Sequence, residues 1–468
     1  MVDNRQKISH WWRQILEQDG DQPLRASLNA DREADVCIVG AGYTGLWTAY
    51  ELLRGDPQLS VVLLDAEVAG YGASGRNGGA VIAQLNGSRE FWTKRGGREG
   101  AIAMERAAQQ AVVCIGEAVQ REGIDCSYSA NGVLMAARNE LEANHFRHTV
   151  EEDRLWGFGP EDSRYLSKDE LEERVHVDGA IGARFSPHCA SIHPGRLVRG
   201  LAQAVERLGA VIYEQTRVTS ISPHLATTGA GGVTAKYVLR ATEAYTETIP
   251  TESRQIIPVY TSMIVTDPIS EAILSEIGWA GREALLAEHP FLHLQHTADH
   301  RITIGGDDNR VPYRYGSAPS PDGPPPERVS RTYHRELVKL FPPLADVTIG
   351  QAWQGVFGTN RIWAPSVSLD QTTGLGAAGG YVGEGVAISN LAGRTLADLV
   401  LGRDSELTRL PWVGLSARRW EPEPLRYLGA QLIWSMRTLG DVSERRTGKA
   451  SPLFPLGNRL AGFTGHLG

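Results

Sequence analysis

A short, continuous run of apolar residues, Val36 to Val39, is the first regular pattern in the chain. Such a run is typical of a strand that is buried on both faces of a parallel sheet. After a glycine-rich turn, apolar residues recur at helical spacing, at Leu46, Ala49, Tyr50 and Leu53. A second apolar run, Val61 to Leu64, ends in Asp65. The pattern predicts a strand, a helix and a second strand in the order of a parallel β-α-β unit.

The turn that joins the first strand to the helix reads Gly40-Ala41-Gly42-Tyr43-Thr44-Gly45. Gly40 permits the tight turn, Gly42 lets backbone N–H groups approach a pyrophosphate, and Gly45 allows the helix to pack closely on the strand. Asp65, 20 residues after Gly45, can accept a hydrogen bond from a ribose hydroxyl. A chance match in a glycine-rich chain is the alternative. The strand, turn, helix and acid together favour a dinucleotide site.

A second glycine-rich segment, from Tyr71 to Val81, follows the second strand. Its small residues allow close backbone approach and offer many N–H donors, which suits a flat ring or a phosphate. A mobile surface loop is the simpler interpretation of such a composition. Which of the two applies depends on the rest of the chain.

Further along the chain, the periodicity predicts helices at 8–18, 99–122, 140–155, 197–208, 328–340 and 424–439. It predicts strands at 211–213, 258–265 and 291–304, with a hairpin at 229–239. We therefore expect an α/β (α+β) fold, in which a Rossmann-like domain with a parallel sheet is interleaved with a second domain built on a mainly antiparallel sheet.

Composition excludes several classes of protein. The 468 residues are 41% hydrophobic and carry a net charge of −8, so general affinity for nucleic acid is not expected. No run of 18 apolar residues predicts a transmembrane helix, and the polar N-terminus resembles no signal peptide, so we expect a cytoplasmic protein. The four cysteines show no CxxC spacing, which argues against a zinc site or a disulfide framework.

Together, GAGYTG, Asp65 and the segment GASGRNGG resemble the D-amino-acid oxidase superfamily of FAD-dependent oxidoreductases. The resemblance is closer to its gamma-glutamylputrescine oxidase and glycine/sarcosine oxidase-like branch. Downstream segments that are similar to the family's motifs are His193 to Ala202, Val218, Ala241 to Tyr245, Ile304 to Gly306, Trp353 to Val356 and Gly379 to Ala387. Within Ala241 to Tyr245, Glu243 stands where the family usually has Asn.

The resemblance implies FAD as the cofactor. The residues that it assigns to FAD binding are Gly40, Gly42, Tyr43, Thr44, Gly45, Asp65, Ala66, Gly72, Ala73, Ser74, Arg76, Asn77, Gly78, Gly79, Val218, Ala241, Thr242, Gly355, Gly380, Tyr381, Gly383, Gly385 and Val386. Some relatives tether FAD through a His in the first loop, where this chain has Asn77. We therefore expect non-covalent FAD.

The resemblance also divides the chain. We expect an N-terminal arm (1–33), an FAD-binding domain in three parts (34–98, 181–253 and 347–405), an interleaved helical region (99–180), a substrate domain (254–346) and a C-terminal extension (406–468). The active site is expected between the two domains.

The activity that this resemblance implies is oxidation of a C–N bond in a small amine or amino acid. Hydride passes to flavin N5, water hydrolyses the resulting imine, and oxygen accepts the electrons to give hydrogen peroxide. Sarcosine oxidases use a Lys near the flavin for the oxygen step, and the comparable stretch, 254–262, has none. A dehydrogenase that passes electrons to another carrier, and a non-catalytic flavin-binding subunit, are the alternatives.

Four residues are candidates for catalysis or substrate binding. Tyr381 is a candidate for capping the substrate pocket, Tyr260 for lining it, and Arg361 for binding a carboxylate. His193 is weighed as a catalytic group against a simple role at the start of a helix. Glu243 is a possible partner for a substrate cation, although surface placement is the expectation. Trp11 and Trp12 are expected to pack.

Overall fold

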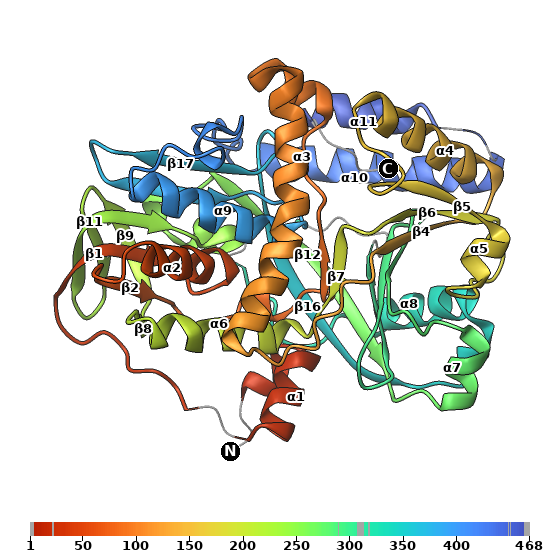
Figure 1. The fold of residues 1–468 in the computed structure, drawn as a ribbon, viewed down its shortest axis with the longest axis horizontal. Helices are drawn as coiled ribbons and strands as arrows, with labels where there is room; N and C mark the ends of the chain where they lie inside the picture. The colour runs from red at the N-terminus through yellow and green to blue at the C-terminus, as the bar shows by residue number, and fades with distance from the viewer. Residues whose placement is uncertain are drawn as a thin grey trace.

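The computed structural model describes residues 4–20, 23–288, 290–306, 313–316, 319–447, 449 and 451–462. Two large sheets are interleaved along the chain, one mainly parallel and one mainly antiparallel (Figure 1). This confirms the expected fold class. The domain boundaries themselves stay a prediction.

The mainly parallel sheet carries the strand predicted from Val36 to Val39 at its centre, and its order is β17-β18-β11-β1-β2-β8. Its strands are β1 (Arg32–Val39), β2 (Val61–Leu64), β8 (Val211–Tyr213), β11 (Gly232–Arg240), β17 (Ser366–Asp370) and β18 (Leu375–Gly379). The hairpin of β9 (Val218–Ser222) and β10 (Leu225–Thr228) pairs with β11. Because β1 is parallel to both β2 and β11, the carboxyl ends of these three strands meet at one edge.

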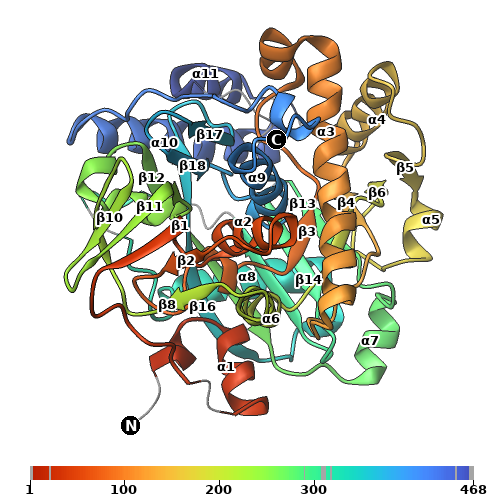
Figure 2. The same ribbon diagram turned by 60° about the vertical axis from the view of Figure 1, so that its left-hand side comes forward.

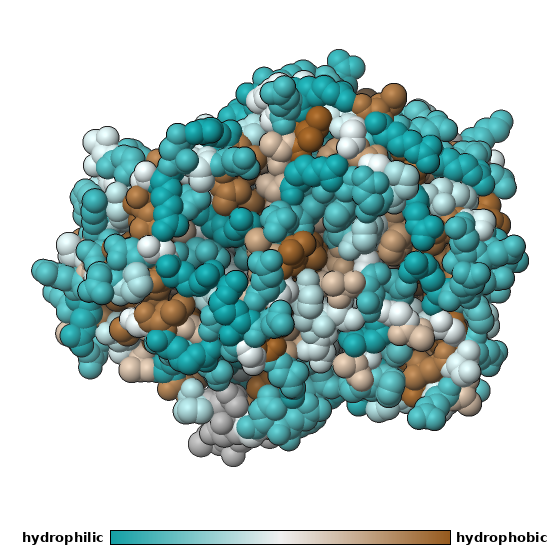
Figure 3. All heavy atoms as spheres, in the orientation of Figure 1, coloured by the Kyte–Doolittle hydropathy of each residue, from teal (hydrophilic) through white to brown (hydrophobic). Residues whose placement is uncertain are grey.

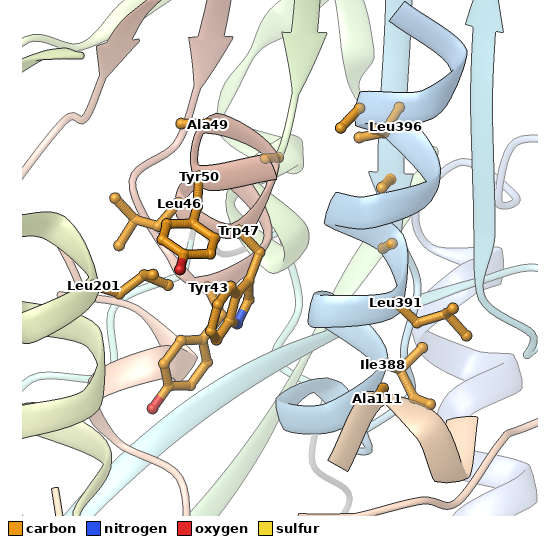
Figure 4. Close-up of a cluster of buried hydrophobic side chains, with 14 of the residues drawn as sticks. Tyr43, Leu46, Trp47, Ala49, Tyr50, Ala111, Leu201, Ile388, Leu391 and Leu396 are labelled. Carbon is orange, nitrogen blue, oxygen red and sulfur yellow. The ribbon is translucent and has the colours of Figure 1, made fainter. Parts of the chain in front are cut away.

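Four helices cover one face of this sheet: α2 (Tyr43–Gly55), α3 (Arg89–Glu122), α6 (Pro194–Arg207) and α9 (Gly385–Val400). Figure 4 shows Trp47 and its neighbours on α2 between α6 and α9. An added Cβ at Gly393 of α9 would lie 2.6 Å from Cβ of Trp47, so α2 and α9 can approach this closely only because Gly393 has no side chain. Figures 1 and 2 both show α3 beside these helices.

The second sheet has the order β16-β12-β15-β14-β13-β4-β6-β5. Its strands are β4 (Val133–Ala137), β5 (Arg164–Ser167), β6 (Gly182–Ser186), β12 (Ile256–Thr266), β13 (Ala284–Ala287), β14 (Leu292–His296), β15 (Ile302–Gly306) and β16 (Ile349–Asn360). One face packs on α5 (Lys168–Glu172), α7 (Glu271–Ile277) and α8 (Glu327–Leu340). The other face is turned toward the parallel-sheet domain, where Met263 packs with Trp11 and Trp353.

The remaining elements are short or peripheral. They are η1 (Asn4–Lys7), η2 (Ala73–Gly75), η3 (Glu243–Thr248), η4 (Pro250–Glu252), η5 (Pro342–Leu344), η6 (Leu407–Arg409), α1 (His10–Gln18), α4 (Glu140–Leu155), α10 (Leu425–Thr447), α11 (Leu453–Ala461) and the strand pair β3 (Ala80–Ile82) and β7 (Cys189–Ser191). The helix predicted at 140–155 coincides with α4. The one predicted at 99–122 begins earlier, at Arg89, because α3 continues across a break at Gly97, where φ is +69°.

The N-terminal arm is built into the molecule. Trp11 and Trp12 of α1 are 1% and 0% exposed, which confirms that both pack. The Ser9 hydroxyl donates to the carbonyl of Gly75 (2.7 Å), and the Trp11 indole N–H donates to the carbonyl of Asn77 (2.8 Å). The arm therefore rests on the second glycine-rich segment.

The C-terminal helix α10 exposes apolar side chains. Leu428, Leu432 and Leu439 are each more than half exposed along one side of it. Figure 3 shows a face of the molecule on which hydrophilic side chains dominate and apolar ones are scattered. Among the described residues, no helix combines the length and apolarity needed to cross a membrane.

Candidate active site

The first glycine-rich turn joins β1 to α2 and has no room for side chains. Gly40 has a φ of +107°, and its N–H donates to the carbonyl of Leu64 (2.8 Å). An added Cβ at Gly45 would overlap the carbonyl oxygen of Gly40. The glycines therefore leave the backbone accessible where α2 begins, and the partial positive charge of that helix end favours an anion there.

Asp65 lies at the end of β2, beside this turn. Its carboxylate accepts hydrogen bonds from the amides of Ala41 (2.8 Å) and Glu67 (2.9 Å). Burial raises the pKa of Asp65 to about 6, although the two N–H donors act in the opposite direction. The carboxylate is thus fixed by the backbone, with capacity left to accept further hydrogen bonds.

The second glycine-rich segment folds over the first turn. The Ser74 hydroxyl accepts a hydrogen bond from the amide of Tyr43 (2.9 Å). The Asn77 side chain donates to the carbonyls of Ala73 and Ser74 and accepts from the amide of Gly79 (2.9 Å). Asn77 therefore shapes the segment from within.

Arg76 points away from this turn. Its buried guanidinium donates to the carbonyls of Tyr71 (2.8 Å), Ile8 (2.9 Å) and Gln354 (3.2 Å), and it pairs with Asp322 (2.7 Å). Arg76 therefore links the second glycine-rich segment to the N-terminal arm and to β16.

A third glycine-rich segment precedes α9. The Tyr381 hydroxyl lies 2.8 Å from that of Thr44, and its carbonyl accepts a hydrogen bond from Asn86 (2.9 Å). Burial raises the pKa of Tyr381. Tyr381 thus connects this segment to the start of α2.

These three segments enclose one cavity of about 320 Å³. The residues assigned to FAD that line it are Gly40, Gly42, Tyr43, Thr44, Asp65, Ala66, Gly72, Ala73, Ser74, Asn77, Val218, Ala241, Thr242, Tyr381, Gly383, Gly385 and Val386. The others, Gly45, Arg76, Gly78, Gly79, Gly355 and Gly380, are not part of this lining. Val218, at the start of β9, and Val386, in the first turn of α9, both belong to this lining.

The cavity fits FAD. Its bare glycine turn at the start of α2 suits a pyrophosphate, and Asp65 suits a ribose. Where the cavity reaches the start of α9, the partial positive charge of a second helix end favours negative charge on a reduced flavin ring. These assignments to individual residues rest on the lining and on the resemblance.

The antiparallel sheet covers Gly78 and Gly79 with polar side chains that the sequence analysis did not single out. An added Cβ at Gly78 would lie 2.8 Å from Nδ1 of His293, and one at Gly79 would overlap Oε1 of Gln295. Burial lowers the pKa of His293 to about 4, so its ring is neutral at pH 7. The signal was present in the alternation Leu292-His293-Leu294-Gln295, in which both leucines pack in the core.

Two glutamates flank Tyr381 in structure. Glu243 was expected at the surface; instead it lines the cavity, and its Oε1 accepts hydrogen bonds from the amides of Gly380 (2.9 Å) and Tyr381 (3.1 Å). Glu384 precedes the first residue of α9, between two glycines of the lining. Burial raises the pKa of each carboxyl to about 7.

The remaining candidates lie outside the cavity lining. Arg361 is occupied by Glu421 (3.2 Å) and by the carbonyl of Ala461, in the C-terminal extension. The Tyr260 ring lies under the guanidinium of Arg314, 3.6 Å from its ring centre.

His193 caps the start of α6. Its Nδ1 accepts a hydrogen bond from the amide of Arg196 (3.1 Å), and its ring packs edge-on against Trp11. Burial lowers the pKa of His193 to about 3. These contacts favour the helix-starting role over the catalytic one.

Known proteins are similar to this chain in sequence and in fold. The chain is 30% identical over 417 residues, 86% of its length and 93% of the relative's, to gamma-glutamylputrescine oxidoreductase of Escherichia coli K12. It is 25% identical to glycine oxidase of Geobacillus kaustophilus, over 81% of this chain and 96% of that one.

Among solved structures, glycine oxidase from Geobacillus kaustophilus aligns with a TM-score of 0.68 at 22% identity, covering 84% of this chain and 100% of that one. L-proline dehydrogenase from P. horikoshii aligns with a TM-score of 0.67 at 20% identity, covering 82% and 98%. The profile of the family described as "DAO: FAD dependent oxidoreductase" matches residues 35–399. The chain therefore belongs to the DAO family of FAD-dependent oxidoreductases.

Proposed function

We propose that this enzyme oxidises a C–N bond of a small amine or amino acid, with oxygen as electron acceptor and hydrogen peroxide as product. The observation that carries the proposal is the single cavity shared by the two FAD-binding glycine segments and the loop before α9, next to a sheet that faces them with His293 and Gln295. Bound FAD supplies the acceptor for a hydride from the carbon next to nitrogen, and water then hydrolyses the imine.

The names of the relatives support amines and amino acids as the substrate class, since they include an oxidoreductase of gamma-glutamylputrescine and an oxidase of glycine. Among the described residues that line the cavity, Arg217 is the one permanent cation. It precedes Val218 in the chain, and it pairs with Glu67 (3.0 Å). Near Tyr381, the described residues of the cavity lining include no arginine that could bind a substrate carboxylate. This favours an amine over an α-amino acid.

A substrate amine must lose its proton before its carbon can give up a hydride. Glu384 and His293 are the side chains that we propose as acceptors of that proton. The His293 ring lies against Gly78 of the second glycine-rich segment. Glu384 stands between Gly383 and Gly385 of the cavity lining, and burial shifts the pKa of both groups. With a pKa of about 7, the Glu384 carboxylate matches the working pH better than the His293 ring, whose pKa is about 4.

A dehydrogenase that passes electrons to another carrier is the second candidate. No lysine belongs to the described lining of the cavity, and none occurs in 254–262. A lysine near the flavin is the feature expected to speed the reaction with oxygen, so the absence of lysine from the described lining is the observation that favours this second candidate.

The test is anaerobic. The purified, FAD-loaded protein is mixed with primary amines, secondary amines and amino acids, and the visible flavin band is followed. We expect an amine to bleach the band, and readmitted air to restore it with formation of hydrogen peroxide. Bleaching that air does not reverse, but a quinone analogue does, would establish the dehydrogenase. A protein that no compound in the panel bleaches would contradict the proposal.

A further inference from the structure

Glu243 has an unusual backbone conformation. It follows Thr242 at the end of β11, and its φ is +45°, in the left-handed region. Asn tolerates this region better than other residues with a side chain, and Asn is what the resembling motif carries here. A glutamate in this backbone conformation costs conformational energy, which contacts of its side chain must offset.

The carboxylate of Glu243 contacts two distant parts of the chain. Oε1 accepts the two amides of Gly380 and Tyr381, and Oε2 faces the backbone of Gly358 in β16, where an added Cβ would overlap it. Oε2 is buried and lacks a hydrogen bond of good geometry among the described residues, although the nearby Gly358 amide favours the ionised carboxylate. One side chain thus connects the end of β11, strand β16 and the segment before α9.

Among the residues that the structure describes, none forms a direct ion pair with this carboxylate. The nearest cation, Arg240, instead donates to Thr246 (2.8 Å) and Gln255 (3.0 Å) and pairs with Glu252 (3.2 Å). Tyr381, the other titratable group facing Glu243, bonds to Thr44 through its hydroxyl. Burial therefore outweighs the charge of Arg240 and the backbone N–H donors, and the pKa of Glu243 rises to about 7.

We propose that Glu243 is a positioning residue for the FAD site: its carboxylate fixes the amides of Gly380 and Tyr381, and protonation of that carboxylate loosens the segment and weakens FAD binding. A carboxylate accepts stronger hydrogen bonds from N–H groups than a neutral carboxyl does. The group is ionised at pH 8 and protonated at pH 6. FAD affinity is therefore expected to fall as the pH falls through about 7. The proposal concerns cofactor binding, so it stands whatever the substrate is.

The test is a titration of the apoprotein with FAD, followed by flavin fluorescence between pH 5.5 and pH 8.5. In the wild type we expect the dissociation constant to rise about tenfold from the alkaline to the acid end. Glu243→Gln should bind about tenfold more weakly at pH 8.5 and show no such pH dependence. Glu247→Gln is the matched control: Glu247 is also on η3 but bonds to Arg254 and Arg426, outside the cavity lining. It should titrate like the wild type.

The thermal midpoint of each apoprotein separates positioning from simple damage. Because burial raises the pKa of Glu243, the ionised form costs folded-state stability at pH 8, and Glu243→Gln should be no less stable there. Weak binding that accompanies a lower midpoint would overturn the proposal, as would a variant that binds FAD like the wild type at every pH. If Glu243→Gln does not fold, the same titration and thermal denaturation are carried out on Glu243→Asn, which suits the backbone but is one methylene shorter. The same two results would overturn the proposal.

Discussion

Glu384 carries a carboxyl group to the start of α9, between Gly383 and Gly385 of the cavity lining. Burial raises its pKa to about 7, so the group is neutral at pH 6 and ionised at pH 8. If it accepts the proton of the substrate amine, kcat/KM should rise with pH through about 7.

Replacement of Glu384 by Gln removes the proton acceptor. We expect kcat/KM at pH 8 to fall about a hundredfold and the rise near pH 7 to disappear. The measurement is the rate of anaerobic flavin bleaching as a function of pH. Glu406→Gln, at an exposed glutamate beyond α9, serves as the control. An unchanged pH profile in Glu384→Gln would assign the proton to another group.

At this scale the sequence shows which residue types are available but not which of them meet. Gly40, Gly42 and Asp65 were predictable because their partners lie within one β-α-β unit. The contact between Glu243 and Gly380 joins residues 137 positions apart, and no local pattern indicates it. The expectation that Glu243 lies at the surface was wrong for this reason.

At the scale of elements, close packing of α2 on β1 requires a glycine at position 45, in the first turn of the helix. An added Cβ at Gly45 would overlap the carbonyl of Gly40, so Gly45→Ala should push α2 away from β1. We expect a loss of ~2–3 kcal/mol in the free energy of unfolding, together with loss of FAD. Denaturant unfolding and flavin content measure the two effects.

A glycine on α10, Gly429, serves as the control for Gly45. Gly429 has no atom within 4 Å of an added Cβ, so Gly429→Ala should stabilise the protein by up to about 1 kcal/mol, through helix propensity alone. A destabilisation of similar size in both variants would show that crowding at Gly45 is not the cause.

Periodicity predicted most elements because their apolar faces are buried locally. The helices α4 and α8 and the strand β8 lie where the spacing placed them. The start of α3 was missed because Gly96 and Gly97 indicate a break, and the chain resumes the helix after it. The alternation of apolar and polar residues in β14 is visible in the sequence. Whether its polar side chains face the site depends on which domain covers that side of the sheet.

At the scale of the whole molecule, the N-terminal arm lies outside the stretch that the family profile matches, which begins at residue 35. It nevertheless bonds to Gly75 and Asn77 of an FAD segment. Trp11→Phe keeps an aromatic ring, although a smaller one, and removes the N–H that donates to Asn77. We expect FAD to bind about fivefold more weakly, with a smaller effect on unfolding, as measured by FAD titration and thermal denaturation.

Trp156→Phe is the comparison, since that indole lies under the guanidinium of Arg98 and neither residue belongs to the cavity lining. Equal FAD affinities for the two variants would mean that the arm packs on the segment without supporting it.

The arm also has a consequence for the order of folding. It leaves the ribosome before the segments on which it packs, since Gln14 bonds to Asp299, 285 residues later, and His10 stacks on Trp353. Closing a chain over such separations is slow and entropically costly. During synthesis, Trp11 stays without Met263, Val265 and Trp353, with which it packs, until β16 has been made. A nascent chain shorter than this is expected to present an exposed indole, which makes it a natural client for chaperones that bind apolar segments.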